Sequence, residues 1–354
     1  MGSRAFKWIL FVLLPLLVSS CQEPAGEPSL PFRKDVPVLL GTRIESYDLR
    51  EIHFNLDLAV IKGDNETNEI QEYTGLPDSS FKFIDFLTTF TANNTWVNHT
   101  VEKVEFVDTI PSSDFLTMFL IDQSSYPESF DSTDYYNQRF QAFNGFYRTL
   151  EGQGKVVFSS YKRKDLTHNV LDIINPEPSD HWNPEIAGGL LDLTHKQGGT
   201  AALYDGLESA ILYLAGKTSQ HKSITLFVRN KDDGKSKLTL PDVITLANQH
   251  NIKINVIWLI HSTANVDLAA LRQLSAKTGG FSVYMNSAYQ SSSVFLGLTK
   301  LLKMNLQFYR VFVKMTIGAP NYFNPKYSTG VYLYYYTSKF YTWSWIPVYL
   351  EKPI

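Results

Sequence analysis

The chain has 354 residues, with 32 lysines and arginines against 35 aspartates and glutamates and a net charge of −3. These totals argue against a nucleic-acid-binding protein, which needs a clustered basic face. A hydrophobic content of 44% with 14% aromatic residues is enough for a sizeable core, and the length favours two domains.

The N-terminus is predicted to be a secretory signal peptide. Arg4 and Lys7 precede an apolar run, Trp8–Val18, which leads into small residues before Cys21. This run is shorter than the about 20 apolar residues that a membrane-spanning helix requires. We therefore expect residues 1–20 to direct export, and we expect no transmembrane anchor in the exported protein.

Cys21 is the only cysteine in the sequence, so no intramolecular disulfide can form. The segment Val18–Cys21 resembles the lipobox of bacterial lipoproteins. The resemblance implies that the signal peptide is removed before Cys21 and that the thiol carries lipid, with more than one acyl chain for stable anchoring. The alternative is an ordinary signal peptide with an incidental cysteine near its end. Residues 21–32 are rich in Pro, Gly and Glu, and we expect the stretch after Cys21 to be a tether.

Residues 33–112 are predicted to form a small β-sandwich-like domain. Leu49–Ile61 alternates apolar and polar residues, which is typical of a half-buried strand. Phe81–Ile84 and Val101–Val107 are predicted to be further strands. Helical periodicity is not seen before Ser112, which favours an all-β arrangement for this part.

Residues 113–305 alternate buried apolar strands with amphipathic helices. The predicted strands are 115–121, 155–161, 169–174, 223–228, 252–260 and 281–285, and the predicted helices are 135–150, 203–215, 240–250, 268–278 and 292–304. This alternation predicts an α/β fold with a doubly wound, mostly parallel sheet.

Residues 306–354 return to strand patterns. Tyr309–Ile317 alternates, and Gly330–Leu350 is dense in tyrosine and tryptophan, which favour strands. We expect this C-terminal β segment to pack with residues 33–112. An aromatic carbohydrate-binding face is the alternative, although aromatic strand residues more often pack than bind ligands.

A candidate site lies where the predicted parallel strands end, because ligands of doubly wound sheets bind outside the carboxyl ends of their strands. Asp122 and Ser124 follow the first strand, and Gly198–Leu207 reads Gly-Gly-Thr-Ala-Ala-Leu-Tyr-Asp-Gly-Leu. With the helix that ends in Thr-Gly-Gly at Gly280, these segments resemble the von Willebrand factor type A domain. The resemblance implies a metal-ion-dependent adhesion site with oxygen ligands for Mg²⁺ or Mn²⁺ from Asp122, Ser124 and Thr200.

The sequence departs from that motif at two positions. Tyr126 stands where the family has a second serine, and the nearest equivalent of the expected aspartate in the third loop is Asn230. Asn230 and Asp232 are therefore additional candidate ligands, because hard cations require oxygen donors. Two readings stay open. Either a partner's carboxylate completes a weak cation site, or the site is inert and Asp122 and Thr200 only hydrogen-bond the loops together.

These observations predict a lipid-anchored, non-enzymatic protein of a bacterial cell envelope that binds a protein partner through its type A-like part. Gln22 replaces the Asp that resembles an inner-membrane retention signal, which favours the outer membrane of a Gram-negative bacterium. The alternative is a structural subunit of an envelope complex with an inert metal site. An enzyme acting on glycan or peptide is less favoured, because the sequence offers no recognisable set of acid, base and nucleophile.

Overall fold

The computed structural model describes residues 36–48, 50–63, 70–72, 82–84, 97–108, 114–125, 138–165, 168–193, 198–259, 267–285, 291–303, 307–317, 326–337 and 340–351. All of them belong to one compact unit, Lys34–Ile354. The predicted signal peptide, Cys21 and the tether lie outside the described residues. Among the described residues, no helix combines the length and the apolar character needed to cross a membrane.

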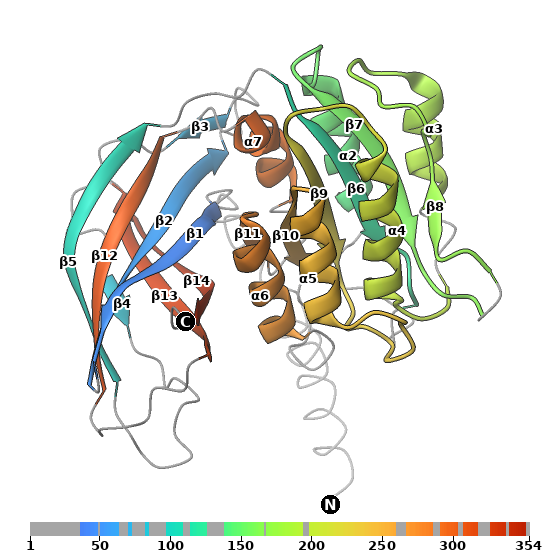
Figure 1. Ribbon diagram of the computed structural model, residues 1–354. Helices are drawn as coiled ribbons and strands as arrows, with labels where there is room; N and C mark the ends of the chain where they lie inside the picture. The colour runs from blue at the N-terminus through green and yellow to red at the C-terminus, as the bar shows by residue number, and fades with distance from the viewer. Residues whose placement is uncertain are drawn as a thin grey trace, which may run out of the picture. The chain divides into compact units, whose positions relative to one another are not determined.

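A mostly parallel sheet forms the centre of this unit (Figure 1). Its strands, in spatial order, are β11 (Ser282–Met285), β10 (Ile252–Leu259), β9 (Lys222–Val228), β6 (Leu116–Asp122), β7 (Lys155–Tyr161) and β8 (Leu171–Ile173). Neighbouring strands run parallel except β8, which pairs antiparallel with β7. The predicted α/β class with a mostly parallel sheet is confirmed.

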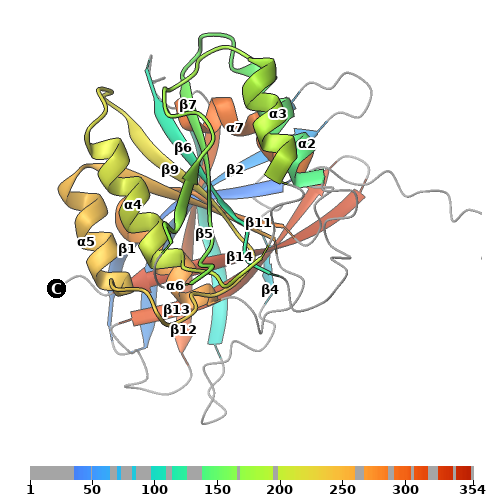
Figure 2. The ribbon, with the colours of Figure 1, turned by 90° about the vertical axis from the view of Figure 1, so that its right-hand side faces the viewer.

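Helices cover both faces of the parallel strands (Figures 1 and 2). One face carries α2 (Gln138–Thr149), α3 (Pro184–Asp192) and α7 (Ser291–Lys303), and the other carries α4 (Leu203–Ala215), α5 (Leu240–Gln249) and α6 (Leu268–Thr278). Alternate residues of β6 serve the two layers: Phe119 packs in the first cluster and Met118 in the second. Burial on both faces explains why the strand sequences are continuously apolar.

Local signals fix the ends of several helices. The Thr239 and Asp242 side chains form a capping box at the start of α5. Gly279, with φ of 69°, ends α6 in the left-handed conformation that glycine adopts at little cost. Helix α3 was not predicted from the sequence, yet it begins at Asn183, whose side chain accepts a hydrogen bond from the Glu185 amide at 2.7 Å.

Antiparallel strands extend this sheet beyond β11. Their order is β5 (Val97–Asp108), β12 (Gln307–Ile317), β2 (Glu51–Gly63) and β1 (Val36–Tyr47), with β3 (Ile70–Glu72) also paired to β2. β1 joins β11 antiparallel with Leu39 opposite Ser282, so one 11-stranded sheet runs through the described residues. The alternation predicted in β2 is confirmed, since Ile52, Phe54 and Leu56 are buried. This continuity with the parallel strands was not predicted.

A second, three-stranded sheet has the order β14 (Phe340–Glu351), β13 (Lys326–Thr337) and β4 (Lys82–Ile84). Leu350 of β14 is buried in the same cluster as Phe54 and Val313, so this sheet packs on the antiparallel part of the large one. C-terminal strands thus pair or pack with N-terminal ones, while the predicted domain boundaries stay a prediction. The side chains of the aromatic stretch before Leu350 lie outside the description, and the carbohydrate-binding alternative is not tested.

Candidate functional site

The predicted site residues lie in loops that the backbone ties together at the carboxyl ends of the parallel strands. The Ser125 amide donates to the Gly199 carbonyl oxygen at 3.0 Å. Arg163 and Thr200 exchange two backbone hydrogen bonds, of 2.8 and 3.0 Å. The Asp233 amide donates to the Ala201 carbonyl oxygen at 2.7 Å. We call residues 123–125, 162–165, 198–202 and 229–237 the loop cluster.

The Asp122 carboxylate is fully buried and holds two of these loops together. Its Oδ1 accepts hydrogen bonds from the Ser124 amide and hydroxyl, at 2.9 and 2.5 Å. Its Oδ2 accepts from the amides of Arg229 and Asn230, at 3.1 and 3.0 Å. An ionised carboxylate offers about four lone-pair sites, and here each oxygen accepts twice. Asp122 is therefore saturated by groups of the protein itself.

Asn230 is brought to Asp122 and Ser124, as the sequence suggested, but it presents a donor. Its Nδ2 donates to the Ser124 hydroxyl oxygen at 2.7 Å and to the Ser125 carbonyl oxygen at 3.5 Å. The Asp232 carboxylate serves a different purpose. It accepts from the Tyr204 amide at the start of α4, from the Ser236 hydroxyl and from the Gly234 amide, at 3.2, 2.7 and 2.9 Å. Asp232 therefore shapes its own loop.

Thr200 belongs to a second network whose centre is Arg163, a residue that the sequence analysis missed. The Thr200 hydroxyl donates to Asp233 Oδ2 at 2.7 Å, and Arg163 Nε donates to the same oxygen at 2.7 Å. Arg163 Nη2 donates to Asp205 Oδ2, also at 2.7 Å. The Arg163 side chain is only 8% exposed, against 10% for Asp205 and 5% for Asp233. One guanidinium thus bridges a carboxylate in the first turn of α4, Asp205, and a carboxylate in the loop after β9, Asp233.

The remaining carboxylate oxygens of this network are also used. Asp205 Oδ1 accepts from the Lys237 amide at 2.7 Å, and Asp233 Oδ1 accepts from the Lys235 amide at 2.9 Å. Asp205 lies in the segment that resembles the type A motif, and Arg163 follows β7 by two residues. Those two positions are the only sequence signal for the pair, because position relative to a strand end does not reveal which charges meet.

Electrostatics follow these contacts. Burial acts to raise the pKa of Asp233, but the hydrogen bonds from Arg163 and Thr200 outweigh it and hold the pKa below its usual value. The hydrogen bond to Asp233 raises the pKa of Arg163. Burial, and then the nearby Asp122 charge, raise the pKa of Tyr161 well above its usual value. The first two shifts favour a charged Arg163–Asp233 pair, and the third favours a neutral Tyr161.

A hard divalent cation needs several oxygen ligands with free lone pairs. Both Asp122 oxygens are saturated, the Ser124 oxygen accepts from Asn230, and the Thr200 hydroxyl is committed to Asp233. Arg163 already supplies a positive charge next to the Thr200 oxygen. In the part of the chain that the structure describes, no group of three or more His, Cys, Asp or Glu residues is placed to hold a metal ion. In this arrangement the candidate residues do not fit a hard cation.

Comparisons with known proteins add structural likenesses only. No family model and no curated protein matches the sequence. A von Willebrand factor type A protein from Catenulispora acidiphila matches with 10% identity and a TM-score of 0.42, over 90% of this chain and 74% of that one. The ArnB paralog VWA2 from Sulfolobus acidocaldarius matches with 12% identity and a TM-score of 0.38, over 90% and 76%.

Proximal thread matrix protein 1 from the mussel byssus, with a zinc-occupied MIDAS motif, matches with 14% identity and a TM-score of 0.41. That match covers 59% of this chain and half of the mussel chain. Von Willebrand factor type A proteins are therefore among the solved structures that this chain resembles.

Proposed function

We propose that this protein is a lipid-anchored cell-envelope protein that binds a protein partner through the loop cluster, and that the binding needs no divalent cation. The observation that carries the proposal is the Arg163 bridge between Asp205 and Asp233. Together with saturated Asp122, it fixes the loops from within the chain. Loops held in one conformation before binding lose less conformational entropy when a partner arrives.

Charge on the loop cluster suggests the kind of partner. Lys164, Lys231, Lys235 and Lys237 are exposed there. Within the described residues, no carboxylate forms an ion pair with any of them. Lysines at the rim of an interface attract an acidic surface and speed its association. We therefore propose a partner whose contact surface carries several carboxylates, which meet lysine side chains and not a metal ion.

Binding is proposed in preference to catalysis. A hydrolase needs a positioned acid, base or nucleophile that is free to exchange protons with a substrate. The carboxylates at the loop cluster are engaged by other protein groups: Asp122, at the end of β6, by amides and a hydroxyl, and Asp233 by Arg163 and Thr200. Such engagement supports a structural task for them.

Photo-cross-linking in intact cells tests the proposed surface. A photoreactive amino acid replaces Lys231 in the full chain, with exposed Gln249 at the other end of the α5 layer as the matched control. We expect a protein adduct from position 231 that survives EDTA and weakens with Lys164→Glu and Lys235→Glu. Loss of the adduct in EDTA would contradict a cation-independent contact.

The same experiment separates the alternative of a structural subunit that contacts its complex through the antiparallel strands. A probe at Phe106 of β5, which is 45% exposed, reports on that surface. Adducts from position 106 without any from position 231 would favour the structural subunit. Adducts from position 231 alone favour the loop cluster.

Lipid attachment is tested separately, because Cys21 lies outside the described residues. Cells fed a labelled palmitate analogue should label the wild-type chain and leave Cys21→Ser unlabelled. We expect the labelled protein to fractionate with the outer membrane. A wild-type chain without label would remove the anchor from the proposal and leave the partner-binding part untouched.

A further inference from the structure

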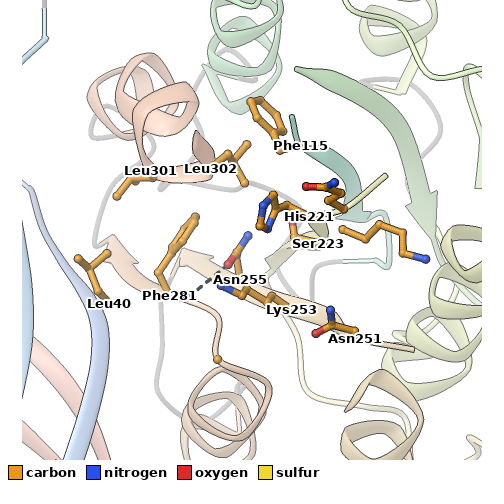
Figure 3. Close-up of a pocket in the computed structure, with 13 residues that line it drawn as sticks. Leu40, Phe115, His221, Ser223, Asn251, Lys253, Asn255, Phe281, Leu301 and Leu302 are labelled. Atoms are coloured by element: carbon orange, nitrogen blue, oxygen red, sulfur yellow. Dashed lines mark hydrogen bonds between the residues drawn. The ribbon is translucent and has the colours of Figure 1, made fainter. Parts of the chain in front are cut away.

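A pocket of about 360 Å³ opens at the edge of the sheet where the parallel strands begin (Figure 3). Residues at the starts of β9 and β10 line it, together with the end of α7 and Phe281 before β11. The loop cluster lies at the opposite edge, where the strands end, so this pocket is separate from the proposed partner surface. Its volume falls at the small end of the about 300–1,000 Å³ that small-molecule sites span.

The two sides of the pocket differ in chemistry. Figure 3 shows Phe281, Leu301 and Leu302 on one side, with His221, Ser223 and Lys253 facing them. The three apolar residues belong to the main core cluster and are 6%, 2% and 9% exposed. An apolar group placed against them would leave water, which is favourable by about 25 cal/mol per Å².

The polar side is cationic. Lys222 and Lys253 stand at the starts of two neighbouring parallel strands, where Lys222 is in register with Ile252 and Lys253 with Ser223. Side chains at successive register positions point to opposite faces of a sheet, so Lys253 shares the face of Ser223 that borders the pocket, and Lys222 points to the other face. His221 lies directly before β9, and its ring faces the pocket (Figure 3). Among the described residues, no carboxylate forms an ion pair with Lys222, Lys253 or His221. Parallel pairing therefore gathers cations at one edge without supplying their counter-charge.

Buried polar groups beside these cations are already satisfied. The Ser223 hydroxyl donates to Thr117 Oγ1 at 3.1 Å. Asn255 Oδ1 accepts from the Phe281 amide at 3.2 Å, and its Nδ2 donates to Thr225 Oγ1 at 3.5 Å. Their hydrogen bonds hold the wall in place, which leaves the Lys253 ammonium group as the donor available to a ligand.

We propose that this pocket binds a small amphiphilic anion, a carboxylate on an aliphatic body. The carboxylate would lie at the Lys253 ammonium group, beside His221, and the aliphatic part would cover Phe281, Leu301 and Leu302. A charged side and an apolar side line the same cavity. A ligand with only a charge or only an apolar body would therefore contact only one of these sides favourably. The proposal stands independently of partner binding at the loop cluster.

Calorimetric titration of the full chain with three probes of matched chain length tests the proposal. Octanoate carries the proposed charge, octanol is neutral, and octylammonium inverts the charge. We expect one octanoate per chain, bound at least about tenfold more tightly than octanol, a ratio equivalent to about 1.4 kcal/mol. Octylammonium should bind most weakly. Failure of octanoate to saturate, or octylammonium binding as well as octanoate, would overturn the proposal.

Variants separate the charged side from the apolar side. Lys253→Glu should weaken octanoate binding at least about tenfold and strengthen octylammonium binding, because it reverses the charge that faces the pocket. Lys103→Glu, at an exposed lysine of β5 that belongs to neither site, is the matched control and should change the affinity of neither ligand. Leu40→Trp, at a half-buried lining position on β1, should weaken octanoate and octanol alike by narrowing the pocket.

Circular dichroism melting of each variant shows that the fold is kept. Unchanged octanoate affinity in the folded Lys253→Glu variant would overturn the proposed site for the head group. Unchanged affinity in folded Leu40→Trp would overturn the proposed position of the aliphatic part.

Discussion

The two edges of the parallel sheet differ in how their charged side chains are paired. Where the strands end, Arg163 is enclosed between Asp205 and Asp233, and Asp122 accepts four hydrogen bonds from neighbouring loops. Where the strands begin, Lys222 and Lys253 line a pocket and no described carboxylate pairs with them. Both edges collect polar groups for the same reason, since parallel strands bring equivalent ends together.

This difference shows that the position of a candidate site does not reveal whether its polar groups are free to bind a ligand. The carboxyl edge carries the residues of a recognisable motif, yet the lone pairs that a cation would use are taken by amides, hydroxyls and a guanidinium. The opposite edge carries no such motif, and within the described part of the chain no carboxylate pairs with its Lys253.

Removing Arg163 should have the largest effect on this comparison. Arg163→Met leaves Asp205 and Asp233 facing each other with little exposure, and breaking a buried ion pair from one side costs about 3–5 kcal/mol. Urea unfolding of the purified protein measures that loss. The free energy of unfolding of Arg163→Lys should lie between those of the wild type and Arg163→Met, because lysine keeps the charge but not the planar guanidinium.

Arg310 provides the control for that measurement. It forms a bidentate pair with Asp57, at 2.7 and 2.9 Å, but the two side chains are 35% and 22% exposed. Arg310→Met should therefore cost at most about 1 kcal/mol, as for most exposed pairs. Equal losses for the two methionine variants would mean that burial of the Arg163 network contributes nothing special to the loop cluster.

Asp122→Asn should have the next largest effect. The substitution keeps the shape but places an amide nitrogen where the Ser124 or Asn230 donors now point. A buried donor left without an acceptor costs about 1–3 kcal/mol. The free energy of unfolding from urea titration should fall by that amount with or without magnesium present. A loss that appears only with magnesium would indicate a working cation site.

Sequence patterns predicted the parallel part of the fold well, for a physical reason. Strands buried on both faces and helices with one apolar stripe leave a clear periodic record, as β6 and α4 do. β1 left none, because its register shifts between Leu39 and Gly41 and again between Ile44 and Ser46. Each bulge moves the following side chains to the other face and erases the alternation.

The location of the candidate site could be predicted from the sequence, but the contacts among its side chains could not. Asp122, Ser124 and Thr200 do come to the same edge, because each follows or precedes an element whose position the periodicity gives. Arg163 and its carboxylates are far apart in sequence, and their pairing depends on how loops fold over one another. Local sequence patterns do not reveal such contacts, so the sequence did not predict that the Arg163 guanidinium would bind where a cation was expected.

Acid should lower the stability of the folded protein by protonating Asp233 at the carboxyl edge of the parallel sheet. Its pKa in the folded protein lies below the usual 3.8, so the stability it contributes is complete above that value and is lost as the pH falls through the folded pKa. The free-energy difference between wild type and Asp233→Asn should thus be largest near neutral pH and shrink below pH 3.8. Urea titrations at several pH values check this, and a difference independent of pH would contradict it.

The smallest expected effect separates the two edges most directly. Thermal melting with about 10 mM magnesium or manganese should leave the midpoint unchanged, whereas a ligand present at 100 times its dissociation constant adds about 2.7 kcal/mol to the folded state. Octanoate in the same assay should raise the midpoint, because Lys253 lines the pocket at the opposite edge and forms no ion pair with a carboxylate of the described residues. A metal-dependent rise that Asp122→Asn abolishes would show that amide donors give way to a cation at the carboxyl edge. The contrast between a filled edge and an open one would then be wrong, since both edges would bind ligands.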